Sequence, residues 1–231
     1  MANPNLELLI QAARQLQPLL GELAFVGGCT TSLLITDKGA ADFRPTYDVD
    51  AIAEITSYAA YVKFSQRLRK AGFTEDTSEG APICRWRQNT TILDVMPLDA
   101  KILGFSNRWY RPAMQSADER ELVPGLRVRI VTALYFCATK LEAFAVRGHG
   151  DYHASHDLED LINVIDGRAE IVQEINAADA DVRRYIVSEM RELLMTEAFV
   201  AALPGHLLPD ADSQARLGVL LRRLRQIAAL Y

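Results

Sequence analysis

The sequence predicts a mixed α/β fold with a strand-rich front half and a helical back half. Three observations lead to this prediction. Short apolar runs, typical of buried strands, lie before residue 130. After residue 130, apolar residues recur at helical spacing. A pair of acidic residues flanks one apolar residue where a strand is expected to begin. A chain of 231 residues with 49% hydrophobic and 24% charged residues can form one large domain or two small ones.

The elements of the front half follow from periodicity and turn residues. Leucines at helical spacing open the chain, with Pro18 as an expected kink or stop. Gly27-Gly28 follows the apolar run at residues 23–26 and ends it. The next residues resemble the capped start of a helix, with hydroxyl side chains at Thr30, Thr31 and Ser32. The expected elements are a helix over 5–23, strands over 23–26 and 47–55, a helix over 57–72, strands over 83–88 and 90–96, and one or two strands within 122–131.

The back half has no further strand pattern. Apolar residues recur at helical spacing from about residue 131 to the end of the chain, interrupted by a polar loop over 148–155. We place the division between two domains near residue 130, giving domains of 1–130 and 131–231. The expected helices cover residues 131–147, 156–165, 170–175, 181–194, 197–203 and 213–230.

Composition argues against several classes of protein. The net charge of −5 argues against a uniformly cationic surface for nucleic acid. Cys29, Cys84 and Cys137 are far apart and form no C-x-x-C pair, so neither a disulfide framework nor a zinc knuckle is indicated. No apolar run is long enough to span a bilayer, and the first residues lack the pattern of a signal peptide. We therefore expect a cytoplasmic protein.

A pair of acidic residues lies in the second strand. Asp48 and Asp50 are separated by Val49, so both carboxylates point to one side of the strand. Two carboxylates this close repel each other unless a cation lies between them, and Mg²⁺ prefers such oxygen ligands. Asp94 is an acid in an otherwise apolar strand, where a charge is costly unless it is paired or metal-bound. The three acids together indicate a two-metal site for phosphoryl transfer.

The glycine pair Gly27-Gly28 is the candidate phosphate-binding turn. Glycine has no Cβ to keep the backbone from a phosphate, and its N–H group can face an anion. The expected helix start behind the turn would add a positive dipole end and hydroxyl donors from Thr30, Thr31 and Ser32.

The acids and the glycines also have structural interpretations. Glycine pairs often only form turns, and D-x-D pairs often lie at the edge of a strand. Asp94 is either a metal ligand, an exposed edge residue, or a partner of Arg85 or Arg87 across the hairpin.

Two further groups of residues invite a chemical interpretation. Cys29 beside the glycines would be a nucleophile only with an ordered histidine or acid nearby, and none is evident. His149, Asp151, His153 and His156 could hold a metal, but their spacing matches no standard zinc pattern. We expect that segment to be a polar loop between helices.

The order of the glycine turn, the D-x-D strand and a third acid on the next strand resembles the signature of the nucleotidyltransferase superfamily. The segments Phe25–Gly28 (FVGG) and Arg44–Asp50 (RPTYDVD) are similar to those of AbiEii-type nucleotidyltransferases, which include toxins of bacterial toxin–antitoxin and phage-defence systems. Residues 138–147 and 156–161 are similar to the helical motif of that family, which carries a lysine, an arginine and an acidic pair. The resemblance covers roughly residues 24–166.

The resemblance implies a nucleotidyltransferase-like mixed sheet with flanking helices, followed by a C-terminal helical domain. It implies that Asp48 and Asp50 hold two Mg²⁺ ions and that Asp94 completes the site, with a possible role as the base. Lys140 would contact the triphosphate, and Asp157 would orient Lys140 or Arg147. The residues implied in nucleotide binding are Gly27, Gly28, Thr30, Thr31, Arg44, Lys140 and Arg147.

By the same resemblance, the reaction is magnesium-dependent transfer of a nucleoside monophosphate from an NTP to an acceptor hydroxyl. The implied acceptor is RNA, with the 3′ end of tRNA as the leading candidate, or a protein side chain. A toxin of this kind would have a cognate antitoxin as its partner, an expectation that rests on analogy. Lys140 also has an interpretation without a functional role, in which its side chain extends past apolar neighbours and its amino group reaches solvent.

Two other functions stay open. A small-molecule nucleotidyltransferase of the antibiotic-modifying kind would use the same three acids and would need an anionic acceptor pocket, because aminoglycosides are cationic. A catalytically silent module of the same fold would bind a partner protein, although an intact acid triad argues against a decayed site. Salt-sensitive RNA binding would favour the toxin.

Overall fold

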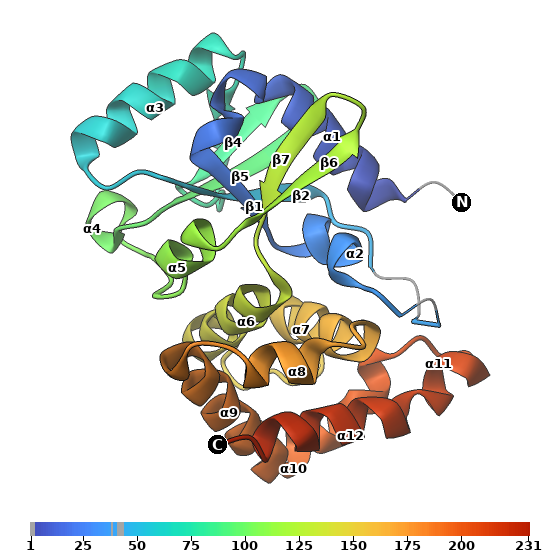
Figure 1. Ribbon diagram of the computed structural model, residues 1–231. Helices are drawn as coiled ribbons and strands as arrows, with labels where there is room; N and C mark the ends of the chain where they lie inside the picture. The colour runs from blue at the N-terminus through green and yellow to red at the C-terminus, as the bar shows by residue number, and fades with distance from the viewer. Residues whose placement is uncertain (1–2, 38, 41–43) are drawn as a thin grey trace. The chain divides into compact units, whose positions relative to one another are not determined.

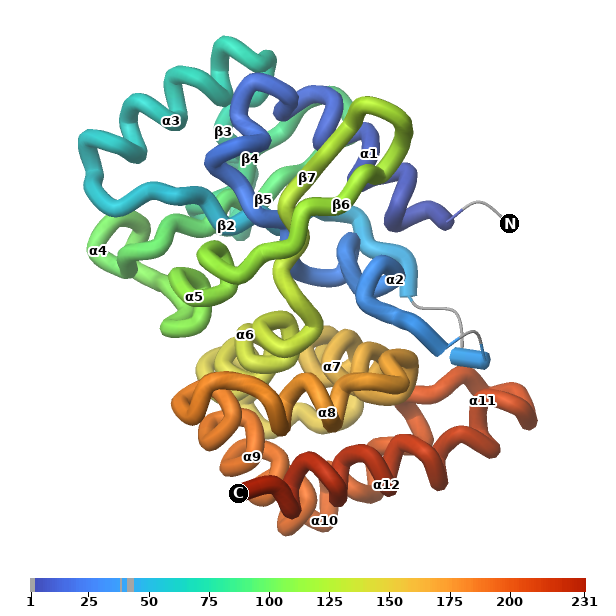
Figure 2. The backbone as a smooth tube through the Cα atoms, viewed as in Figure 1, coloured from blue at the N-terminus to red at the C-terminus, as the bar shows by residue number. Residues whose placement is uncertain are grey.

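The computed structural model describes residues 3–37, 39–40 and 44–231, and it has an α/β fold (Figure 1). Contacts within the chain divide it into two compact units. The sheet unit contains residues 1–32 and 44–132, and the helical unit contains residues 33–43 and 133–231. Figure 2 traces the backbone of each unit. None of the helices in the described ranges is long and apolar enough to cross a membrane.

The sheet unit is built on a mixed sheet with the strand order β3-β4-β5-β2-β1-β7-β6. The central strand β2 is antiparallel to β1 and parallel to β5, whereas β1 is parallel to β7 and β4 is antiparallel to β5. The strands are β1 (Leu23–Val26), β2 (Asp48–Ala53), β3 (Thr74–Glu75), β4 (Arg85–Gln88), β5 (Thr91–Pro97), β6 (Asp118–Val123) and β7 (Leu126–Ile130).

The central strands form the core of this unit. All four residues of β1 are buried, and Phe25, Ile52 and Leu93 from β1, β2 and β5 have no exposed surface. Strands covered on both faces show such continuous apolar runs, so a charged residue within them needs a partner. The acids of β2 and β5 are therefore the exceptional residues of the core.

The helices of the sheet unit are mostly short. Asn3 caps α1 and accepts hydrogen bonds from the backbone N–H groups of Asn5 and Leu6. The predicted helix over 5–23 is wrong beyond Gln15, because the chain continues as a 3-10 helix that contains Pro18. The elements are α1 (Pro4–Gln15), η1 (Gln17–Glu22), η2 (Gly28–Thr30), α2 (Thr31–Leu34, whose end belongs to the helical unit), α3 (Tyr58–Lys70), α4 (Ala100–Leu103) and α5 (Tyr110–Gln115).

The helical unit contains no strand within its described residues. Its predicted helix over 213–230 is in fact two helices, with Arg216 between them. In this unit α6 packs against α7 and α9, and α12 packs against α7, α8 and α9. The elements are α6 (Ala133–Arg147), α7 (His156–Gly167), α8 (Ile171–Asn176), α9 (Ala180–Met195), α10 (Glu197–Ala202), η3 (Leu203–His206), α11 (Ala211–Ala215) and α12 (Leu217–Ala228).

The segment after the glycine turn groups with the helical unit, which differs from the predicted division at residue 130. The backbone N–H groups of Thr36 and Asp37 both donate to the carbonyl of Gly167, at 2.9 Å each. Arg216 donates from Nη2 to Asp37 Oδ2 at 2.8 Å and from Nε to Asp166 Oδ2 at 2.7 Å. The hydrogen bond from Arg216 holds the pKa of Asp37 below its ordinary value. These polar contacts fix the segment on the helices.

We expect Arg216→Ala to lower the free energy of unfolding by about 3 kcal/mol, because it leaves the buried carboxylate of Asp166 without its ion pair. Urea unfolding followed by circular dichroism would measure the change. Arg184→Ala is the control, since Arg184 pairs with Asp181 on an exposed surface, and there we expect a change within about 0.5 kcal/mol. Equal effects of the two substitutions would contradict the expectation.

Candidate active site

The three predicted acids lie on one face of the sheet. Asp50 of β2 is directly opposite Asp94 of β5 in the parallel register. Asp48 lies two residues before Asp50, so its side chain shares that face. Asp94 is buried, whereas Asp48 and Asp50 are partly exposed. The fold thus gathers the three carboxylates at the centre of the sheet.

An arginine on the neighbouring strand neutralises part of this cluster. Arg85 of β4 is opposite Asp94, and its Nε and Nη2 donate to the two carboxylate oxygens of Asp94 at 2.8 and 2.7 Å. The same Nη2 donates to Asp48 Oδ2 at 2.9 Å. The hydrogen bonds to Asp94 raise the pKa of Arg85 above its ordinary value. The predicted alternative in which Asp94 pairs with Arg85 is confirmed, and Arg87 pairs with Asp76 instead.

The donor set of the cluster suits a hard cation. Carboxylate oxygens from two adjacent strands are the ligands that Mg²⁺ prefers. One guanidinium is shared by the two carboxylates of Asp48 and Asp94, so these three side chains keep a formal negative charge that favours a further cation. In the described part of the chain, no group of three or more histidine, cysteine or acidic side chains is placed so that it could hold a metal ion without a rearrangement of side chains. Arg85 lies between Asp48 and Asp94, where such an ion would have to bind.

Gly27 is required by the acid cluster itself. Its φ of +79° and ψ of −170° belong to a region that only glycine adopts readily. A Cβ at this position would lie 2.0 Å from Oδ2 of Asp50. The missing side chain that we interpreted as room for a phosphate therefore also makes room for the Asp50 carboxylate.

The turn after Gly27 differs from the predicted helix start. Thr30 Oγ1 donates to the carbonyl of Gly27 at 2.9 Å, so this hydroxyl closes the turn. The helix α2 has only four residues, too few for the expected dipole to reach a useful size. Thr31 is buried, and its Oγ1 has no hydrogen-bond partner among the described residues. Of the two threonines, Thr31 is thus the one with a donor to offer a ligand.

Cys29 in the same turn is not suited to be a nucleophile. It is fully buried, and its Sγ donates to the carbonyl of Val26 at 3.4 Å. Burial also raises the pKa of Cys84 and of Cys137 to about 12, so both stay protonated near neutral pH. Burial of all three side chains makes the cysteines structural.

Asn5 is a site residue that the sequence analysis missed. Its side chain is fully buried; Nδ2 donates to the carbonyl of Arg44 at 3.0 Å and Oδ1 accepts from the backbone N–H of Thr46 at 2.9 Å. Nδ2 also lies 3.4 Å from the carbonyl of Gly28. Thr46 in turn donates from Oγ1 to Asp48 Oδ1 at 2.9 Å. A lone asparagine near a helix start carries no signal for this role, because it resembles an ordinary cap.

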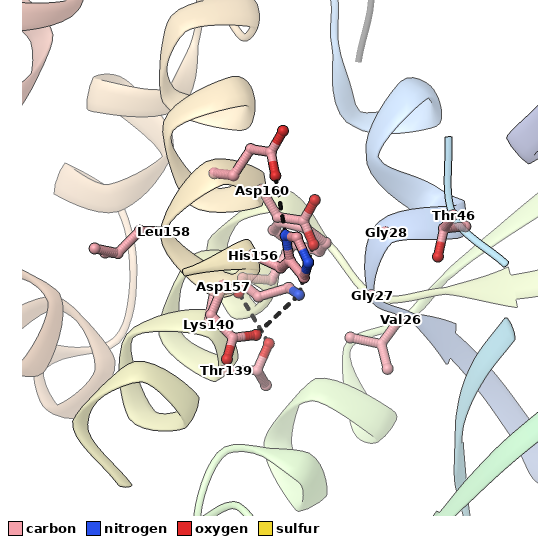
Figure 3. Close-up of polar contacts among 12 residues, drawn as sticks. Val26, Gly27, Gly28, Thr46, Thr139, Lys140, His156, Asp157, Leu158 and Asp160 are labelled. Atoms are coloured by element: carbon pink, nitrogen blue, oxygen red, sulfur yellow. Dashed lines mark hydrogen bonds and ion pairs between the residues drawn. The ribbon is translucent and has the colours of Figure 1, made fainter. Parts of the chain in front are cut away.

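The predicted motif of the back half forms a second charged cluster, within the helical unit (Figure 3). Lys140 of α6 points toward α7, where its Nζ lies 3.1 Å from Asp157 Oδ1 and 2.6 Å from Asp160 Oδ2. Arg147 donates from Nε and Nη2 to the two oxygens of Asp157 at 2.8 and 2.9 Å. The Lys140 side chain is only 12% exposed, so the interpretation of a lysine that reaches solvent is wrong. Asp160, which we did not name as a site residue, shares the lysine.

Asp157 is the centre of this second cluster. Burial alone would raise the pKa of Asp157, but the hydrogen bonds from Arg147 and the charge of Lys140 outweigh it and hold the pKa below its ordinary value. The carboxylate is therefore ionised at neutral pH and keeps both cations in place.

The histidine-rich loop forms no metal site in the described ranges. Asp151 Oδ1 accepts from the backbone N–H groups of His153 and Ala154, as in an ordinary turn. His156 Nδ1 lies 3.3 Å from Glu159 Oε2 on the surface of α7. The expectation of a polar loop at 148–155 agrees with these contacts.

Comparisons with known proteins do not assign the chain to a family. No protein-family model matches the sequence, and a search of curated proteins finds no match.

We expect Gly27→Ala to lower the free energy of unfolding by at least about 2 kcal/mol, because alanine meets both the unfavourable backbone and the Asp50 carboxylate. Thermal or urea unfolding would measure this. Gly21→Ala is the control, since nothing lies within 4 Å of a Cβ there. A fully stable Gly27→Ala protein would contradict the geometry.

We expect the free energy of unfolding to fall as the pH drops below the ordinary Asp157 pKa of 3.8. The pKa of the folded state is lower, so the unfolded chain binds the proton first and acid favours unfolding. Asp157→Asn should lower the free energy of unfolding at pH 7 by about 1 to 3 kcal/mol and should flatten its acid dependence. Urea titrations from pH 3 to 7 would test this, with the exposed Asp181→Asn as control. An unchanged acid slope in Asp157→Asn would show that other groups control it.

Proposed function

We propose that the chain is a magnesium-dependent nucleotidyltransferase that transfers a nucleoside monophosphate from an NTP to an acceptor hydroxyl. The observation that carries the proposal is the set of three carboxylates on one sheet face, with Asp50 in register with Asp94 and packed over Gly27. Acidic side chains are costly in the centre of a sheet, above all the buried Asp94, and a metal-dependent reaction gives a reason for gathering three of them there. The motifs of the AbiEii-type enzymes supply the reaction type.

The roles of the sheet-unit residues follow from their positions. Asp48 and Asp50 would hold the metal ions, and Asp94 would complete the acid set and is the candidate base for the acceptor proton. Bound Mg²⁺ would neutralise the triphosphate and polarise its α-phosphorus. The acceptor oxygen forms a bond to this phosphorus, the bond to the bridging oxygen breaks, and pyrophosphate leaves. Asn5 links the Gly28 turn to Thr46, just before β2, and would help to position the two motifs.

By the motif resemblance, Lys140 and Arg147 are the proposed cations for the phosphates. Lys140 would contact the triphosphate, and Asp157 would position both Lys140 and Arg147 by the contacts described above. Thr31, of the sheet unit, has a buried hydroxyl with no partner among the residues that the structure describes, which suits a donor to a phosphate oxygen. The other proposed nucleotide-binding residues are Gly27, Gly28, Thr30 and Arg44. Thr30 would act indirectly, through the turn that its hydroxyl closes.

The acceptor follows from the motif resemblance alone. We propose RNA, with the tRNA 3′ end as the first candidate and a protein side chain as the second. Activity as a toxin, with an antitoxin partner, is part of the same proposal.

A pocket with two glutamates in its lining favours the small-molecule alternative. The helical unit contains a pocket of about 320 Å³ whose lining includes Glu189, Glu192, Phe144 and Tyr152. Carboxylates beside aromatic rings suit an amino group, as found on aminoglycosides. This alternative predicts transfer of the nucleotide to a cationic small molecule.

The first experiment incubates the protein with each α-labelled NTP, Mg²⁺ and total bacterial RNA, an aminoglycoside panel or no acceptor. We expect label in a tRNA-sized band. Asp48→Asn/Asp50→Asn should reduce the transfer by roughly a thousandfold, because the charge that metal ions neutralise is worth several kcal/mol in the transition state.

The other outcomes separate the acceptors. Label on the protein itself would assign a side chain, and label on an aminoglycoside would assign the small-molecule reaction. Absence of transfer to every acceptor, with all four NTPs, would contradict the proposed activity.

A further inference from the structure

Arg85 has the geometry of a cation shared between two acids. Its Nη2 lies 2.7 Å from Asp94 Oδ2 and 2.9 Å from Asp48 Oδ2, and its Nε binds the second oxygen of Asp94. The arginine side chain is only 20% exposed, and that of Asp94 is 10% exposed. The three side chains come from three adjacent strands, so the sheet register keeps them together.

We propose that Arg85 is the resident counter-cation of the acid cluster and that a divalent metal ion can bind Asp94 only after exchanging with it. The inference rests on the proposed function in one respect, which is that the exchanging cation is a metal ion. The new element is that Arg85, on the strand next to Asp94, competes with the metal ion for the Asp94 carboxylate.

The exchange has a physical reason. Both oxygens of the buried Asp94 accept from one guanidinium, so removing that group without replacement would leave an unpaired buried charge. Arginine remains charged at all accessible pH values, so proton loss cannot release it. Only another cation at the carboxylates, or another anion for the guanidinium, can do so.

A nucleotide with its metal ion supplies both a cation for the carboxylates and an anion for the guanidinium. The metal ion neutralises the carboxylates, and the phosphate oxygens are bidentate partners for the released guanidinium. Binding of metal and nucleotide should therefore be coupled, and metal alone should bind weakly. Arg85 thereby neutralises part of the acid cluster and stabilises the sheet while no substrate is bound.

Arg87 offers a matched comparison. It lies two residues after Arg85 on β4 and shares its sheet face, but it pairs with Asp76 rather than with the acid cluster. Replacing Arg87 removes the same charge from the same strand without opening the space between Asp48 and Asp94.

The experiment measures binding of Mn²⁺ alone, by electron paramagnetic resonance, to the wild type and to Arg85→Gln, Arg85→Lys and Arg87→Gln. We expect Arg85→Gln to bind Mn²⁺ roughly tenfold more tightly or better, because the competing charge is gone. Arg85→Lys, which keeps the charge but not the bidentate contact, should lie between Arg85→Gln and the wild type. Arg87→Gln should match the wild type, and adding Asp94→Asn to Arg85→Gln should remove the gain.

Thermal unfolding gives a second measurement on the same proteins. Arg85→Gln should unfold at a lower temperature than the wild type without metal, and Mn²⁺ should raise its Tm by more than it raises that of the wild type. If Arg85→Gln does not fold, Arg85→Lys carries the test. Mn²⁺ affinity that is unchanged in folded Arg85 variants, or equally raised in Arg87→Gln, would overturn the inference.

The results also separate this inference from the proposed function. Tighter Mn²⁺ binding that requires Asp94, in a protein that transfers no nucleotide to any acceptor, would support the inference and contradict the function. Transfer that requires Asp48 and Asp50, together with unchanged Mn²⁺ affinity in the Arg85 variants, would do the reverse.

Discussion

The structure depends on the requirement that a carboxylate inside a sheet must be paired with positive charge. Three acids lie on one face of the strands β2 and β5, and Arg85 of β4 reaches two of them. The same requirement governs the helical unit, where Asp157 is buried between Lys140 and Arg147. Each unit therefore contains a cluster of opposite charges in a largely apolar setting, and in each cluster the carboxylates are held by cations of the protein itself.

Apolar periodicity was sufficient to predict the long elements. The strands at the centre of the sheet and the helices α3, α6, α7 and α9 lie close to their predicted ranges, because each buries a repeating apolar face. The short helices α4 and α5 were missed, since a helix of four to six residues presents no full period. Local chemistry also overrode the pattern at Pro18 and at Arg216, where predicted single helices are divided.

The acids of the candidate site could be predicted from the sequence, but the residues that pair with them could not. The spacing of Asp48 and Asp50 fixes their common face, and the isolated charge of Asp94 in an apolar strand demands a partner. Whether that partner was a metal ion or Arg85 depended on the hairpin register, which residue types do not specify. The role of Asn5 depends on contacts 23 to 41 residues away in sequence, and no local pattern encodes such contacts.

The segment between the glycine turn and the D-x-D strand has a consequence for synthesis of the chain on the ribosome. The carbonyl of Leu34 and the carboxylate of Asp37 find their arginine partners 134 and 179 residues later, in Arg168 and Arg216. Leu34 and Asp37 thus emerge early, whereas their partners Arg168 and Arg216 are made much later in translation. Vectorial folding cannot complete these contacts before the last helices have left the exit tunnel, so a chain that ends before Arg216 would lack the ion pair that holds Asp37 on the helical unit.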